Sequence, residues 1–276
     1  MRNYHVVIRR ALPVSLLLTF TLVAPGAARA DNTVCTGAVF LIPDGSLHTG
    51  SFTAAGQLRW FRFAVKTDRS YAITVENPSP TDVQPYIEIS EDQSRLGTCA
   101  GPEPDFMYMD SADPASGATM GVIGAARATY KSTSNTDFFF SLVNGVNGQS
   151  YRVRVQETTL FGAFFTTRNG FETYFRISNT TNLPLSVTLK LISDAGMAVA
   201  NQTLTVAANA TAPTIYTGSP TASATGLSVA NDTTGQIIIT HNGPPGGIAV
   251  DGYWGKTGGA NRVAAAIRIE PARQVR

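Results

Sequence analysis

Side chains suited to acid–base chemistry are scarce in this sequence. Beyond the first thirty residues it contains two histidines, His48 and His241. A Ser-His-Asp triad needs a histidine between a nucleophile and a carboxylate, and either histidine could serve. However, the chain has no G-x-S-x-G turn to present a serine. We therefore expect a surface or strand-end histidine at both positions, and we keep a hydrolase with an unrecognised active site as an alternative.

Carboxylates offer two further kinds of chemistry. Loop carboxylates can bind calcium, and one loop holds Asp105, Asp110 and Asp113. Their spacing matches no calcium-loop motif, so a solvated acidic loop is favoured. Paired carboxylates can hydrolyse glycosides, but the sequence pairs none of the candidates Glu88, Glu91, Asp92, Asp137 and Asp251. The chain has no H-E-x-x-H motif and no cluster of histidines and cysteines. We therefore expect no catalytic residue, and calcium is the one cofactor that we keep as an alternative.

Four aromatic residues could bind a sugar through their planar rings. These are Trp60, Tyr174, Tyr253 and Trp254. The flat, apolar face of an aromatic ring matches the face of a pyranose ring, so the four could form a ligand platform. Alternatively, they fill a core or a joint between domains, as aromatic residues commonly do.

The chain has two cysteines, Cys35 and Cys99. In an oxidising compartment such a pair normally forms a disulfide, and this one would stabilise the fold by about 4 kcal/mol. The alternative is two independent buried thiols. A thiol nucleophile is not expected, because neither cysteine lies in a C-x-x-C motif or near a histidine.

These side chains lie on segments with strand-like alternation. Phe61, Phe63 and Val65 fall on one face of their segment and Trp60 on the other. Similar alternation marks residues 70–75, 151–155, 171–178, 185–191, 236–241, 248–254 and 263–269. One apolar and one polar face per strand is typical of antiparallel sandwiches. We therefore predict an all-β chain with loops at 101–121 and 217–235.

The first thirty residues have the pattern of a cleavable signal peptide. Basic residues precede a short apolar stretch, 12–23, and Ala28-Arg29-Ala30 provides a cleavage site. We expect export and cleavage near Ala30, to the periplasm, the cell surface or the medium, with an uncleaved anchor as the alternative. No later segment is long and apolar enough to span a membrane. The remaining 17 basic and 19 acidic residues give a net charge of −2, which disfavours nucleic-acid binding.

Residues 38–157 resemble the bacterial pre-peptidase C-terminal domain. The resemblance rests on four segments: Gln57–Phe63, Ser70–Val75, Val83–Ile89 and Gln149–Val155. It implies a jelly-roll-like sandwich that accompanies secreted enzymes without being catalytic. The usual acidic residue before the tryptophan is Arg59 here, and Gln84 replaces the usual aspartate, so no calcium site is carried over.

Residues 160–270 resemble an immunoglobulin- or fibronectin-like module of exported bacterial proteins. The resemblance rests on Tyr174 to Gly196, which reads as a strand, an Asn-Thr-Thr-Asn turn, a strand and an Asp-Ala-Gly turn. Together the two resemblances predict a signal peptide at 1–30, a jelly-roll-like sandwich at 31–157 and an immunoglobulin-like sandwich at 158–276. The joint is expected near Glu157–Thr159, without a flexible linker.

These observations favour a secreted, non-catalytic binding, adhesion or structural protein. A carbohydrate-binding or enzyme-accessory module is the sharper form of that hypothesis, and a surface-layer or appendage subunit is a further alternative. The expected partner is an extracellular polymer or a protein, and the sequence leaves the oligomeric state open.

Overall fold

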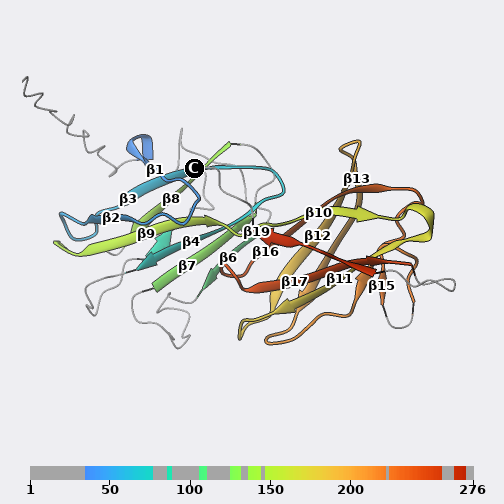
Figure 1. Cartoon of the computed structure of the whole chain (residues 1–276). Helices are drawn as coiled ribbons and strands as arrows, with labels where there is room; N and C mark the ends of the chain where they lie inside the picture. The colour runs from blue at the N-terminus through green and yellow to red at the C-terminus, as the bar shows by residue number, and fades with distance from the viewer. Residues whose placement is uncertain are drawn as a thin grey trace, which may run out of the picture. The chain divides into compact units, whose positions relative to one another are not determined.

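Strands make up the regular structure because Val, Ile, Phe, Tyr and Thr recur at every second position. The structure is a computed structural model that describes residues 35–76, 86–88, 106–110, 125–131, 136–143, 147–221, 224–256 and 264–271. Figure 1 shows these strands along the chain. Within those ranges the only helices are two short 3-10 turns, η1 (Cys35–Gly37) and η4 (Arg168–Gly170). The all-β prediction is confirmed, and no helix among the described residues could cross a membrane.

The N-terminal half contains two sheets. The first has the order β1 (Val39–Phe40), β3 (Arg59–Val65), β8 (Thr136–Val143) and β5 (Tyr86–Glu88). The second has the order β2 (His48–Ser51), β9 (Ser150–Glu157), β4 (Ser70–Glu76), β7 (Ala125–Lys131) and β6 (Phe106–Asp110). Every pair is antiparallel except β1–β3. Strand β6 lies inside the predicted loop 101–121, so that loop prediction is wrong in part, because β6 pairs with β7.

The two N-terminal sheets share one hydrophobic core. Strand β3 contributes the predicted face, with Phe61 and Phe63 fully buried, while Trp60 points the other way. The rings of Phe61 and Phe140 stack with centroids 5.4 Å apart, which joins β3 to β8. Strands β4 and β9 supply the opposite side of the core: Tyr71, Ile73, Val75, Tyr151, Val153 and Val155.

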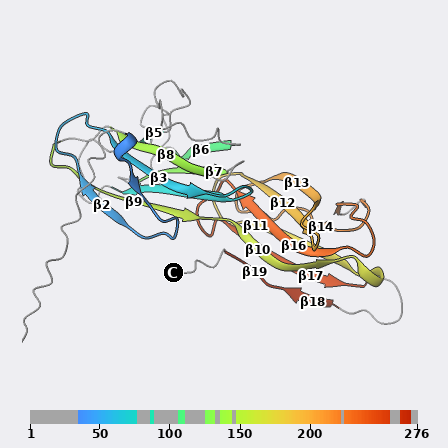
Figure 2. The same ribbon diagram turned by 90° about the horizontal axis from the view of Figure 1, so that it is seen from above.

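The C-terminal half contains the other two sheets, which Figure 2 shows from above. One has the order β13 (Ala198–Val206), β12 (Leu185–Ser193), β16 (Thr234–His241), β10 (Leu160–Thr166) and β19 (Ile269–Pro271). The other has the order β15 (Thr225–Gly226), β14 (Ile215–Tyr216), β11 (Glu172–Asn179), β17 (Ile248–Gly255) and β18 (Ala264–Ile267). Alternate residues of both sheets fill a second hydrophobic core, which includes Phe175, Ile177, Leu189 and Ile239.

The last predicted strand, 263–269, is two strands in the structure. The chain breaks at Arg268, so that β18 pairs with β17 in one sheet and β19 pairs with β10 in the other. The predicted alternation still holds, since Ala265, Ile267 and Ile269 are half-buried and Ala264 and Ala266 are exposed. The single-strand prediction was wrong because alternation continues unchanged when a chain crosses between two sheets that share a core.

The chain passes from the first core to the second through two residues. Strand β9 ends at Glu157 and β10 begins at Leu160. Thr158 and Thr159 between them are 4% and 0% exposed, so the connection is packed rather than flexible. Lys190 Nζ lies 2.5 Å from a carboxylate oxygen of Asp68, which joins β12 to the turn before β4. Residues 31–276 form one compact unit, and the division into domains at 31–157 and 158–276 stays a prediction.

Candidate functional site

The outer face of the sheet around β11 carries the polar and aromatic residues of the C-terminal half. Along β11, Thr173, Phe175 and Ile177 are buried, whereas Tyr174 is half-buried and Arg176 is exposed. This is the alternation that the sequence predicted. An aromatic ring on the polar face of a strand is the feature that singles out this surface.

Three tyrosines from neighbouring strands stand in register on this face. Tyr174 of β11 lies opposite Tyr216 of β14 on one side and opposite Tyr253 of β17 on the other. The Tyr174 and Tyr253 rings are 4.9 Å apart at 8°, and the Tyr174 and Tyr216 rings are 5.5 Å apart at 8°. We call Tyr216, Tyr174 and Tyr253 the tyrosine row. Its rings are stacked face to face, because the spacing between paired strands is close to the spacing of stacked rings.

Hydrogen bonds fix the inner part of the row. The Tyr174 hydroxyl donates to Glu172 Oε2 over 2.6 Å, and the Tyr216 hydroxyl donates to the backbone carbonyl of Ser219. Exposure rises along the row, from 7% at Tyr216 to 41% at Tyr253. Tyr253 is therefore the ring that solvent, or a ligand, can reach.

One face of the Tyr253 ring is covered by Tyr174, so its other face is directed toward β18. The residue opposite Tyr253 on β18 is Ala266, which is exposed. An alanine methyl group is too small to cover a phenol ring. The described residue that follows the row on the β18 side is therefore a small one.

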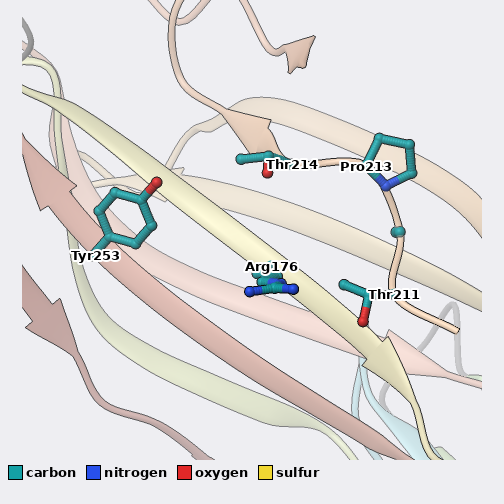
Figure 3. A pocket seen from close by; sticks show the side chains of 6 residues that line it. Arg176, Thr211, Pro213, Thr214 and Tyr253 are labelled. Carbon is teal, nitrogen blue, oxygen red and sulfur yellow. The ribbon is translucent and has the colours of Figure 1, made fainter. Parts of the chain in front are cut away.

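A pocket adjoins the accessible end of the row. It has a volume of about 570 Å³ and is lined by Tyr253, Arg176 and the segment Thr211–Thr214. Figure 3 shows the Arg176 side chain between Tyr253 on one side and Thr211 and Thr214 on the other. Asp251 lies opposite Arg176 on β17 and is exposed as well. The pocket thus combines a ring edge, a guanidinium group and hydroxyl groups, with a carboxylate nearby.

The structure brings together two of the four residues predicted as a ligand platform. Tyr174 and Tyr253 stack, but Trp254 lies opposite the fully buried Thr173, on the inner face of the same sheet. The Trp254 ring packs edge-on against Phe171 at 5.1 Å. Trp60 is on β3, in a sheet that contributes to the other core. Adjacent strand residues point to opposite faces, so Tyr253 and Trp254 cannot share one surface.

His241 lies in a buried polar cluster between β4 and β16. Its Nδ1 accepts a hydrogen bond of 3.1 Å from the backbone N–H of Gly243. Its backbone N–H, not its ring, is directed at the Ser70 hydroxyl, 3.4 Å away. Burial lowers the pKa of His241 from its ordinary value of 6.5 to about 4, against a smaller opposite effect from a hydrogen bond with the Thr158 backbone. The ring is thus placed to hold the fold together rather than to deprotonate Ser70.

The other chemical candidates lie apart from the tyrosine row. The ring of His48 packs edge-on against Phe61 at 5.6 Å. Asp137 forms an ion pair with Arg62 on the β3–β8 sheet. Asp110 and Glu88 are the last residues of β6 and β5. The remaining predicted residues, Cys99, Glu91, Asp92, Asp105 and Asp113, lie outside the described residues.

No group of three or more His, Cys, Asp or Glu side chains within the described ranges is arranged to hold a metal ion. The disulfide between Cys35, in η1, and Cys99 stays a prediction.

Three residues of this surface were missed by the sequence interpretation: Tyr216, Arg176 and Ala266. Strand β14 is two residues long, so Tyr216 gives no alternation to detect. A usable signal was present at Tyr174 and Tyr253, because both tyrosines occupy the polar faces of strands that the sequence did predict. The strand order needed to place Tyr216 and Ala266 beside them is a tertiary property.

No protein-family model matches the chain, and neither a curated protein nor a solved structure matches it.

Proposed function

We propose that this chain is an exported, non-catalytic protein that binds a carbohydrate polymer through the tyrosine row and the adjoining pocket. The observation that carries the proposal is the exposed Tyr253 ring at the end of the row, with Arg176 beside it. The resemblance of residues 38–157 to a non-catalytic accessory domain of secreted enzymes supports the same class.

A sugar ring suits this surface for physical reasons. The axial C–H groups of a pyranose form an apolar face, which can pack on the exposed face of Tyr253, the ring that lines the pocket. The guanidinium of Arg176 has five N–H donors in a fixed plane, and the Asp251 carboxylate accepts from hydroxyl groups. Since Tyr174 already covers the other face of Tyr253, the ring is held in place before a ligand arrives, which lowers the ordering cost of binding.

Export supports a polymer outside the cytoplasm as the ligand. The signal-peptide pattern of residues 1–30 and the pair Cys35 and Cys99 both favour an oxidising compartment. A peptide map under non-reducing conditions should join the two cysteines after export. Two separately alkylated thiols in the exported chain would argue against this part of the proposal.

Affinity electrophoresis against a panel of soluble polysaccharides would test the binding. We expect at least one polysaccharide to retard the protein, and Tyr253→Ala to weaken that retardation roughly tenfold, as for the loss of an aromatic anchor worth about 1.4 kcal/mol or more. Arg176→Ala should weaken it as well.

Phe164→Ala is the matched control, because Phe164 is 40% exposed and Tyr253 is 41% exposed, but Phe164 lies on β10 in the other sheet. Equal loss of binding in the Phe164 and Tyr253 variants would place the site elsewhere. If the panel shows no retardation at all, the carbohydrate proposal fails. Hydrolysis of a polysaccharide in the same gels would instead favour the enzyme alternative.

A further inference from the structure

Strand β13 (Ala198–Val206) is the outer strand of its sheet and is nine residues long. It pairs with β12 on one side, and among the described residues no strand pairs with its other side. Strand β13 and the tyrosine row lie in different sheets of the C-terminal half, so a role for β13 does not depend on the proposed function.

The pairing of β12 determines which backbone groups of β13 are free. The backbone N–H and C=O of Ser186 both bond to Asn242, which lies on the β16 side of β12. Ser186 is opposite Thr205, so the N–H and C=O of Thr205 are directed away from β12. By the same alternation, the backbone groups of Asn201 and Thr203 are also directed outward. The side-chain amide of Gln202 donates to the carbonyl of Thr203 over 3.0 Å, in keeping with that direction.

This edge has few of the features that keep free edges apart. Natural edge strands commonly carry lysine, proline, inward-pointing charges or a strongly twisted bulge. Ala198–Val206 reads AVANQTLTV, with no charged residue and no proline. The strand has a bulge at Val199, near one end, because Leu191 pairs with Ala200 and the next residue, Ile192, pairs with Ala198. Residues 200–206 keep a regular register with β12. From Ala200 to Val206 the edge therefore offers an uncharged, regular row of donors and acceptors.

We propose that β13 pairs with β13 of a second copy of this chain, antiparallel about a two-fold axis at Gln202. Gln202 is the middle residue of the strand, so this register overlaps the full length of the two strands, with the Val199 bulge near each end of the overlap. It places Asn201 opposite Thr203 of the second copy, and the outward backbone groups of each then meet those of the other. Such an interface uses the same surface on both copies and closes on itself.

Apolar residues at the two ends of the strand favour this register. Met197, directly before β13, is 68% exposed and is the most exposed large apolar residue among those described. In the proposed register, Met197 of one copy falls opposite Ala207 of the other, just beyond Val206. Leu183 is 38% exposed and lies two residues before Leu185, the residue of β12 that pairs with Val206. Each Met197 would therefore find an apolar partner at the far end of the other strand.

Disulfide trapping tests the register directly. Gln202→Cys places two thiols opposite each other on the two-fold axis, within the Cβ separation that a disulfide accepts. Thr205→Cys is the control, since two residues 205 would lie roughly 20 Å apart in this register. Thr205 is exposed and Gln202 is half-buried, so random collisions would favour the control.

We expect roughly tenfold more covalent dimer from Gln202→Cys than from Thr205→Cys under mild oxidation, since only the first pair meets the distance requirement. Equal yields, or more dimer from Thr205→Cys, would overturn the proposal. Sedimentation of the protein without added cysteines should show dimers that dissociate on dilution. Asn201→Pro, which removes an outward N–H, should shift the protein to monomer while its thermal unfolding shows that it still folds. A protein that remains monomeric at high concentration would also overturn the proposal.

Discussion

The fold clearly lowers the pKa of His241. This residue is 1% exposed, and the loss of hydration disfavours the charged imidazolium, which lowers its pKa to about 4. Its ring nitrogen is occupied by the N–H of Gly243, so protonation would also remove that acceptor. The neutral ring is therefore part of the native structure.

This depressed pKa predicts acid sensitivity. The unfolded chain takes up a proton at His241 near pH 6.5, whereas the folded chain resists until about pH 4. Between these values the unfolded state binds more protons, so stability falls as the pH falls. The contribution lost is about 3 kcal/mol. Urea unfolding followed from pH 7.5 to pH 4 should show this loss.

Two histidine variants separate this effect from general acid unfolding. His241→Gln should lower stability at pH 7.5 but flatten its dependence between pH 6.5 and pH 4. His48→Gln provides the comparison, and its slope should stay steeper than that of His241→Gln. An unaltered slope in His241→Gln would show that another group causes the acid sensitivity.

At the scale of elements, the close approach of the β12 and β16 backbones requires a glycine on β16. Gly235 of β16 lies opposite Ser193 of β12. A Cβ at position 235 would overlap the backbone carbonyl of Ile192, which cannot rotate away as a side chain could. The pairing of β12 with β16 at this point therefore depends on a glycine at position 235.

Gly235→Ala should lower the free energy of unfolding by about 2 kcal/mol or more, because the backbone of β12 must move. Gly196→Ala provides the comparison: Gly196 has φ +79° in the turn after β12, and a Cβ there meets nothing within 4 Å. Its cost should be about 1 kcal/mol, from backbone conformation alone. Chemical denaturation of the two variants would measure the difference, and equal costs would contradict the clash.

The sequence predicts well which face of a strand is buried, but it predicts poorly which strands lie next to each other in a sheet. Phe61, Phe63 and Val65 were placed on a buried face because alternation is a local property, and they are buried. Alternation also implies opposite faces for Tyr253 and Trp254, yet grouping them by residue type put both in one platform. Tyr216 and Ala266 joined the site only through strand order and register, which depend on contacts between distant segments. The all-β class was therefore predictable, while the composition of the tyrosine row was not.

At the scale of the whole molecule, a buried polar cluster joins the strands of the two cores. The Thr158 hydroxyl donates to the Ser70 hydroxyl over 2.9 Å, and the Ser70 N–H donates to the Thr159 hydroxyl over 2.9 Å. Ser70 lies on β4 and is fully buried. The ion pair between Asp68 and Lys190 is partly exposed and so contributes little, whereas an unpaired buried hydroxyl is costly. We infer that the hydroxyl cluster couples the two cores.

The two tryptophans allow this coupling to be measured, because Trp60 lies on β3, beside the first core, and Trp254 on β17, beside the second. In Trp254→Phe the fluorescence reports the first core, and in Trp60→Phe it reports the second. With Ser70 intact, we expect the fluorescence of the two variants to change at the same urea concentration. Adding Ser70→Ala leaves the Thr158 hydroxyl without its acceptor, at a cost of about 1–3 kcal/mol, and should separate the two transitions. Lys190→Ala, the control, should leave them together. Transitions that are already separate with Ser70 intact would show that the two cores unfold independently.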